Sequence, residues 1–129
     1  MAIPIHVVTL AWLLQAPSGN QETGLATYYA PKFHGRRTAS GTLFDSTMMV
    51  AAHPSLPFGT TVRVHHLASG RSVVVSVVDR GPAAAPRKRG VVIDLSKAAA
   101  DYLGFVQAGR ARVRIETLDH VHAVLPGRR

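Results

Sequence analysis

Hydrophobic and polar residues alternate along several short segments of the chain, which is the pattern of β-strands with one buried face. In segment 71–78, Val73, Val75 and Val77 share one side, and in the closing segment 111–117 the apolar residues alternate with Arg or Glu. The other predicted strands are 25–30, 61–65 and 91–95. Short strands at this spacing predict a mainly β barrel.

Turn and cap residues divide these strands. A Gly-containing turn at 68–70 joins two of them as a hairpin. Ser96 is a suitable N-cap for an Ala-rich helix over 97–103, and Gly104 is a suitable stop. A second helical turn is expected at 45–49.

The first residues resemble an export signal. The apolar stretch from Ile3 to Leu14 is shorter than the about 20 residues that span a bilayer as a helix, and it suits a signal peptide. No Lys or Arg precedes Lys32, and Leu14 stands where a cleavage site usually has a small residue, so a first strand is the alternative. The expected organisation is a signal peptide at 1–16, a linker at 17–23, a barrel at 24–118 and a flexible tail at 119–129.

Composition narrows the class of protein. A chain of 129 residues is expected to form one domain, taken here as a monomer. It contains no cysteine, which excludes disulfides, thiolate chemistry, zinc sites built on Cys and a lipid carried by a cysteine. The net charge of +8 favours polyanionic partners, namely nucleic acid, anionic lipid or the polymers of a cell wall.

A carboxyl group at the end of an apolar strand is the most informative candidate for chemistry. Asp79 follows Val77 on the packed side of its strand and precedes Arg80-Gly81-Pro82. Partial desolvation there would let the carboxyl hold a proton nearer neutrality, as a general acid requires. A turn or N-cap role for an Asp before Gly-Pro is the alternative.

Several motifs in a fixed order resemble the RlpA-like (rare lipoprotein A) family, which is related in fold to expansins and barwin-type domains. The resemblance covers about residues 24–118. The matching segments are Gly24 to Tyr29, Phe33 to Gly41, Phe44-Asp45, Ala51-Ala52-His53-Pro54-Ser55-Leu56-Pro57-Phe58-Gly59-Thr60, Asp79 to Pro82, and Ile93-Asp94-Leu95-Ser96 with the alanines that follow.

The resemblance implies a six-stranded double-psi β-barrel with one or two short helices and a sugar-binding groove. It also implies a lytic transglycosylase that cuts peptidoglycan glycan strands to 1,6-anhydro-muramic acid ends, in the periplasm or outside the cell. In this chemistry the nucleophile is the sugar's own 6-hydroxyl, so one carboxyl group can serve as both acid and base.

The family positions imply roles for particular residues. Asp79 matches the groove aspartate and is the expected acid/base, and His53 matches the groove histidine and is expected to hydrogen-bond the Asp79 carboxylate or a sugar oxygen. Tyr28, Thr42, Asp45 and Arg80 are the expected substrate contacts. An N-cap of the following turn is the favoured alternative for Asp45. Asp94 is expected to be structural, bonded to backbone or Arg80.

Aromatic residues offer a further, less specific signal. Tyr28, Tyr29, Phe44 and Phe58 could include sugar-stacking faces, with a place in the core as the alternative.

Two departures from the family pattern favour a second hypothesis. Thr42 stands where active relatives usually have a glutamate, and Val91 where they usually have an arginine, for which the basic residues of 87–89 could compensate. Threonine cannot donate a carboxylic proton. A non-catalytic, expansin-like wall-binding or wall-loosening domain is therefore the alternative function.

The expected partner is peptidoglycan, with electrostatic contact to anionic wall polymers. Neither a cofactor nor a metal is expected, because the adjacent His65 and His66 point to opposite faces of a strand. A nucleic-acid-binding module would rest on charge alone, because the aromatic residues do not interleave with Lys and Arg. No specific nucleic acid and no membrane span are therefore predicted.

Overall fold

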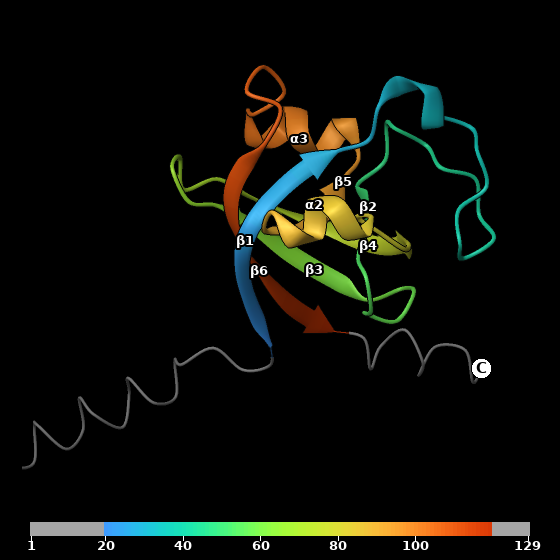
Figure 1. Cartoon of the computed structure of the whole chain (residues 1–129), viewed down its shortest axis with the longest axis horizontal. Coiled ribbons are helices and arrows are strands. Elements are labelled where there is room, and N and C mark those ends of the chain that lie inside the picture. The colour runs from blue at the N-terminus through green and yellow to red at the C-terminus, as the bar shows by residue number, and fades with distance from the viewer. Residues whose placement is uncertain (1–19, 120–129) are drawn as a thin grey trace, which may run out of the picture.

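The computed structural model describes residues 20–119, which form a closed six-stranded barrel with two short α-helices (Figure 1). The strands are β1 (Gln21–Tyr28), β2 (Val50–Ala52), β3 (Thr61–His66), β4 (Ser72–Asp79), β5 (Val91–Leu95) and β6 (Ala111–Asp119). The helices are α2 (Ala84–Lys88) and α3 (Lys97–Leu103), and η1 (Pro31–Phe33) is a 3-10 turn. The predicted fold class is confirmed.

The barrel closes in the order β1-β5-β2-β4-β3-β6. The pairs β1–β5 and β2–β4 are parallel, and the remaining four pairs are antiparallel. Ala52 of β2 pairs with Asp94 of β5 on one side and with Asp79 of β4 on the other. Two carboxyl residues therefore lie at one level of the sheet with a single short strand between them.

The core follows from the alternation in the strands. In β4, Val75 and Val77 are buried while Val74 is exposed, as the sequence pattern predicted. Helix α3 begins at its N-cap Ser96, whose side chain accepts a hydrogen bond from Ala99 N–H, and ends at Gly104. The positive φ of 85° at Gly104 is the left-handed conformation that terminates a helix. Apolar burial in the barrel and against α3 stabilises the fold.

Three local predictions differ from the structure. Strand β1 begins at Gln21, because residues 21–23 pair with β6 although their side chains are exposed, so part of the predicted linker belongs to the barrel. Residues 45–49 form a hydrogen-bonded turn rather than a helix. Helix α2 lies in a loop for which no helix was predicted, and its Pro86 is in the first turn, where a missing N–H is tolerated.

Some predictions lie outside the described residues. They are the signal peptide at 1–16 and the tail beyond Asp119. Within residues 20–119, no helix is long and apolar enough to cross a membrane. The long connection between β1 and β2 stands out from one side of the barrel (cyan to green in Figure 1), and it supplies part of the site described next.

Candidate active site

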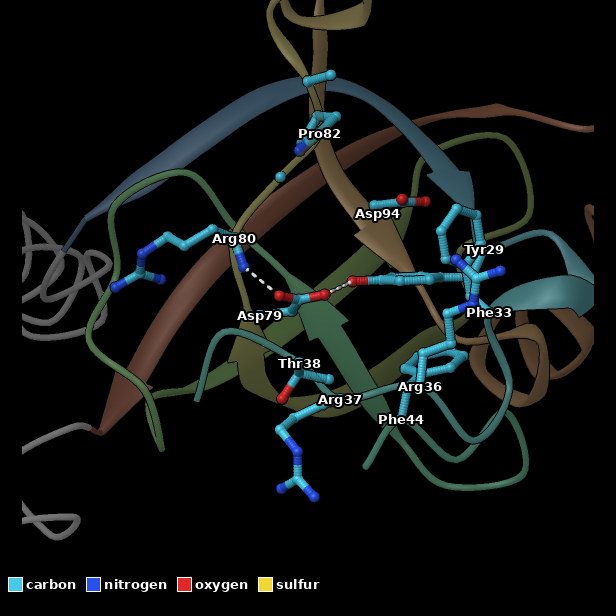
Figure 2. Close-up of a pocket in the computed structure, with 12 residues that line it drawn as sticks. Tyr29, Phe33, Arg36, Arg37, Thr38, Phe44, Asp79, Arg80, Pro82 and Asp94 are labelled. Atoms are coloured by element: carbon cyan, nitrogen blue, oxygen red, sulfur yellow. Dashed lines mark hydrogen bonds between the residues drawn. The ribbon is translucent and has the colours of Figure 1, made fainter. Parts of the chain in front are cut away.

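A cavity of about 420 Å³ lies where β1, β4 and β5 meet the long connection between β1 and β2. We call it the Asp79 cavity. Figure 2 shows its carboxyl, aromatic and arginine side chains. It is lined by Tyr29, Phe33, Arg36, Arg37, Thr38, Phe44, Asp79, Arg80, Gly81, Pro82, Ala83 and Asp94.

Three hydrogen-bond donors converge on the Asp79 carboxylate. Oδ1 accepts from the backbone N–H of Ala39 at 2.8 Å and of Arg80 at 2.9 Å. Oδ2 accepts from the Tyr29 hydroxyl at 2.6 Å. Figure 2 shows the last two bonds as dashed lines. Asp79 is the last residue of β4 and is half-buried, so its carboxyl is fixed in position while still reaching the cavity.

Tyr29 is held by aromatic packing as well as by Asp79. Its ring stacks on Phe44 with centroids 4.1 Å apart and meets Phe33 edge-on at 5.7 Å. Burial, the hydrogen bond to Asp79 and the charges of Asp79 and Asp94 all raise the pKa of Tyr29 above its usual range. The phenol therefore stays protonated and acts as a donor to Asp79.

Asp94 faces the same cavity from β5. Its Oδ1 accepts a hydrogen bond from the Thr27 hydroxyl at 3.1 Å, and not from backbone or Arg80 as predicted. Burial is the main cause that raises the pKa of Asp94 to about 6. The hydrogen bond from Thr27 lowers this pKa, and the negative charge of Asp79 raises it. A carboxylic acid of this kind is partly protonated near neutral pH.

Arginine side chains give the cavity a positive rim. Arg36 lies 5.6 Å from the ring centroid of Phe33. The Arg80 guanidinium points away from the Asp79 carboxylate (Figure 2) and donates to the carbonyl oxygens of Leu56 at 2.8 Å and His53 at 3.3 Å. Arg80 thus supports Asp79 through its backbone N–H.

A second cavity of about 350 Å³ lies next to the Asp79 cavity. Both are lined by the run from Arg80 to Ala83, and Pro54 and Arg87 complete the lining of the second. Asp79 and Asp94 line only the first cavity and Arg87 lines only the second. We call the two adjacent cavities the groove.

The structure places the His53 ring away from the Asp79 carboxylate, so the predicted hydrogen bond between them is wrong. Nδ1 accepts from the backbone N–H groups of Ser55 and Leu56, each at 3.1 Å, and Nε2 lies 3.2 Å from Glu22 Oε1. His53 is only 7% exposed and lines a separate cavity of about 250 Å³. We call this one the His53 cavity.

Two of the predicted substrate contacts have local partners instead. The Tyr28 hydroxyl donates to the Val106 carbonyl oxygen at 2.9 Å, and the residue is not among those that line the Asp79 cavity. Asp45 Oδ1 accepts from the N–H and the hydroxyl of Thr47, and these bonds lower the pKa of Asp45. This agrees with the alternative interpretation of Asp45 as a cap of the turn that follows it.

Thr42 belongs to a small cluster of hydroxyl groups. Its Oγ1 lies 3.1 Å from both Thr38 Oγ1 and Ser40 Oγ, and of the three residues only Thr38 lines the Asp79 cavity. The position that carries a glutamate in the family's usual pattern thus carries a neutral hydroxyl bonded to its neighbours.

No role at Asp79 was predicted for Tyr29, and Asp94 was predicted to be structural. A signal existed for Asp94: Val91, Ile93 and Leu95 are buried, so the alternation of a strand places residue 94 on the opposite face. For Tyr29 no comparable signal existed, because its bond to Asp79 joins residues 50 positions apart.

Residues 20–119 contain no group of three His, Asp or Glu side chains placed to hold a metal ion.

Comparison with known proteins finds relatives that match most of this chain. The model of the lytic transglycolase family matches residues 21–115. The probable endolytic peptidoglycan transglycosylase RlpA of Treponema pallidum is 50% identical over 101 residues, which are 78% of this chain and 30% of that protein. The endolytic peptidoglycan transglycosylase RlpA of Vibrio cholerae is 45% identical over 106 residues, which are 82% of this chain and 39% of that protein. The chain thus spans less than two fifths of these relatives' length.

Solved structures share the barrel. The Streptomyces papain inhibitor superposes with a TM-score of 0.62 at 28% identity, covering 80% of this chain and 98% of the inhibitor. An expansin of Clavibacter michiganensis superposes with a TM-score of 0.60 at 22% identity, covering 78% of this chain and 52% of the expansin, which shows a common fold. With a family match over most of its length and relatives 45–50% identical, this chain belongs to the RlpA-like, double-psi β-barrel family of lytic transglycosylases.

Proposed function

We propose that this chain is an endolytic peptidoglycan transglycosylase that leaves 1,6-anhydro-muramic acid ends, with Asp79 as its acid/base. The observation that carries the proposal is the convergence of three donors on the Asp79 carboxylate, which faces an open groove in a chain of this family. Backbone donors and a packed phenol fix the carboxylate before substrate arrives, and such preorganisation is what catalysis requires.

The reaction requires neither a metal nor an activated water. The bond between C1 of muramic acid and the oxygen of the next sugar breaks, and the muramic 6-hydroxyl attacks C1 to close the anhydro ring. The leaving oxygen must gain a proton and the 6-hydroxyl must lose one. A single carboxyl group at Asp79 is chemically sufficient for both transfers.

The shape and charge of the groove fit a long anionic polymer. Two adjacent cavities share the run Arg80 to Ala83, so a strand that passes over this run would contact both of them. Arginines line the groove, and the whole chain carries a charge of +8. Electrostatic attraction of muramic or peptide carboxylates and of anionic wall polymers follows. Action on peptidoglycan implies a periplasmic or secreted location.

The proposal is tested by digesting purified sacculi and identifying the fragments by mass spectrometry. We expect anhydro-ended fragments from the wild type and a loss of about 10²–10⁴-fold in Asp79→Asn. Asp101→Asn is the matched control, because it removes one carboxylate from the exposed face of α3 and should cut normally. Absence of anhydro ends from the wild type on both peptide-bearing and peptide-free strands would overturn the proposal.

The residue Thr42 favours a second candidate function. With a hydroxyl in place of the family's usual glutamate, the barrel could bind and loosen the wall without cutting it. Pelleting with sacculi distinguishes the candidates: binding that weakens with salt, together with no fragments, would indicate a wall-binding domain. Thr42→Glu in the same assays shows whether a carboxyl at this position increases cutting.

A further inference from the structure

Asp94 is a half-buried carboxyl residue that lines the Asp79 cavity and that the mechanism above does not use. Its neighbour in the sheet on one side is Thr27 of β1, and on the other side is Ala52 of β2. Ala52 in turn pairs with Asp79. At the usual strand spacing the Cα atoms of Asp94 and Asp79 are about 9–10 Å apart, and both side chains line the same cavity. Two carboxyl groups that line one cavity can act on two atoms of one bound substrate, here the leaving oxygen and the 6-hydroxyl.

The two carboxyl groups have different surroundings. Asp79 accepts hydrogen bonds from two backbone N–H groups and one phenol, and each of these donors stabilises negative charge. Asp94 accepts one bond, from the neutral Thr27 hydroxyl. Burial raises the pKa of Asp94 to about 6, which leaves it protonated in part of the population at neutral pH. In enzymes with two carboxyl groups, different surroundings commonly make one group the acid and the other the base.

We propose that Asp94 is the proton donor to the leaving oxygen and that Asp79 is the carboxylate that takes the proton from the 6-hydroxyl. This inference rests on the proposed function. It assigns the two proton transfers to two carboxyl groups, although one group could perform both.

The step balances without water or a cofactor. As the bond from C1 to the leaving oxygen breaks, that oxygen receives the Asp94 proton and becomes the hydroxyl of the departing strand. Carbon C1 then bonds to O6, whose proton passes to Asp79. The products leave with Asp94 ionised and Asp79 protonated, and exchange with solvent through the open groove restores both groups.

The charged groups that face Asp94 are few. Asp79 from β4 and the Tyr29 phenol that follows β1 interact with it, and Thr27 of β1 donates to it. Three arginines also line the cavity: Arg36 and Arg37 from the connection between β1 and β2, and Arg80, whose guanidinium is bonded to loop carbonyl oxygens. A substrate that excludes water from this cavity would raise further the preference of Asp94 for its neutral form.

A test that isolates proton donation uses two substrates in parallel. One is the natural glycan strand, whose leaving sugar needs a proton. The other is a muramic glycoside of 2,4-dinitrophenol, whose leaving group departs without one. We expect Asp94→Asn to lose about 10²–10⁴-fold in kcat on the natural strand and to remain within about tenfold of the wild type on the aryl glycoside. Asp79→Asn should be impaired on both.

Controls separate this inference from the proposed function. Asparagine can still accept the Thr27 bond, so Asp94→Asn should fold, and an NMR spectrum confirms it. Thr27→Val keeps the carboxyl but removes the bond that lowers its pKa, so the alkaline fall of the rate should move to higher pH while kcat at low pH is kept. Full activity of Asp94→Asn on natural strands would overturn the inference alone. An inactive wild type on both substrates would overturn the proposed function and this inference with it.

Discussion

The Asp79 cavity and the His53 cavity contain similar residue types and put them to different uses. In the first, two half-buried carboxyl groups face open space, with donors gathered on one of them. In the second, the imidazole of His53 is buried and both ring nitrogens are already bonded. A titratable group that faces a cavity and can still form hydrogen bonds is able to act on a ligand. A group whose hydrogen bonds are all made within the protein stabilises the fold instead.

The comparison also gives His53 a supporting role. Its Nδ1 fixes the backbone of Ser55 and Leu56, and the Leu56 carbonyl receives the Arg80 guanidinium. The Arg80 N–H in turn donates to Asp79. The backbone of His53 also contacts the site directly, because its N–H donates to the Asp79 carbonyl oxygen at 3.1 Å and its carbonyl oxygen accepts from Arg80. The imidazole therefore supports the site through the loop that it holds, and the backbone through these two bonds.

The largest effect expected on stability involves the Asp94 carboxyl. Burial raises the pKa of Asp94 from an ordinary 3.8 to about 6, so the folded protein binds this proton more tightly than the unfolded chain does. The stabilisation from proton binding is complete below pH 3.8 and is lost as pH rises through about 6. At pH 8 Asp94→Asn should be more stable than the wild type by roughly 3 kcal/mol at most, since one pKa unit is about 1.4 kcal/mol.

Urea unfolding of both proteins at pH 4 and pH 8 measures this difference. The two should nearly coincide at pH 4 and separate at pH 8. Asp101→Asn serves as the comparison, because Asp101 is exposed and its partner Lys97 is on the same helix face, so the change should be small at both pH values. A constant gap between Asp94→Asn and the wild type would show that Asp94 ionises normally.

The next largest effect tests whether His53 stabilises the protein without taking part in the chemistry. His53→Ala removes a buried ring and leaves the partly buried N–H groups of Ser55 and Leu56 without their acceptor, which costs about 1–3 kcal/mol. We expect a lower free energy of unfolding, with anhydro-ended products still formed below the melting transition. A variant that is as stable as the wild type and yet cuts nothing would mean that His53 takes part in the chemistry.

Sequence patterns predicted the barrel better than the site. Alternation in β4 and the cap residues Ser96 and Gly104 are local signals, and they placed their elements within a residue or two. Strand β2 has only three residues and offered no pattern of its own. The direction in which His53 points was not predictable, because its Nε2 lies beside Glu22, a residue 31 positions earlier in the chain.

The smallest expected effect is a change in kcat, and it is tested with two adjacent tyrosines as a matched pair. Tyr29→Phe removes the donor to Asp79 Oδ2 but keeps the ring stacked on Phe44, so the fold should be retained and kcat should fall about tenfold. Tyr28→Phe removes the same atom one residue earlier, where it donates to the Val106 carbonyl, so it should leave kcat unchanged. Both are measured as anhydro-ended fragments released per minute from the same sacculi. Equal rates for the two variants would mean that the phenol bonded to Asp79 contributes nothing to the reaction, and that the two backbone donors alone hold the carboxylate in place.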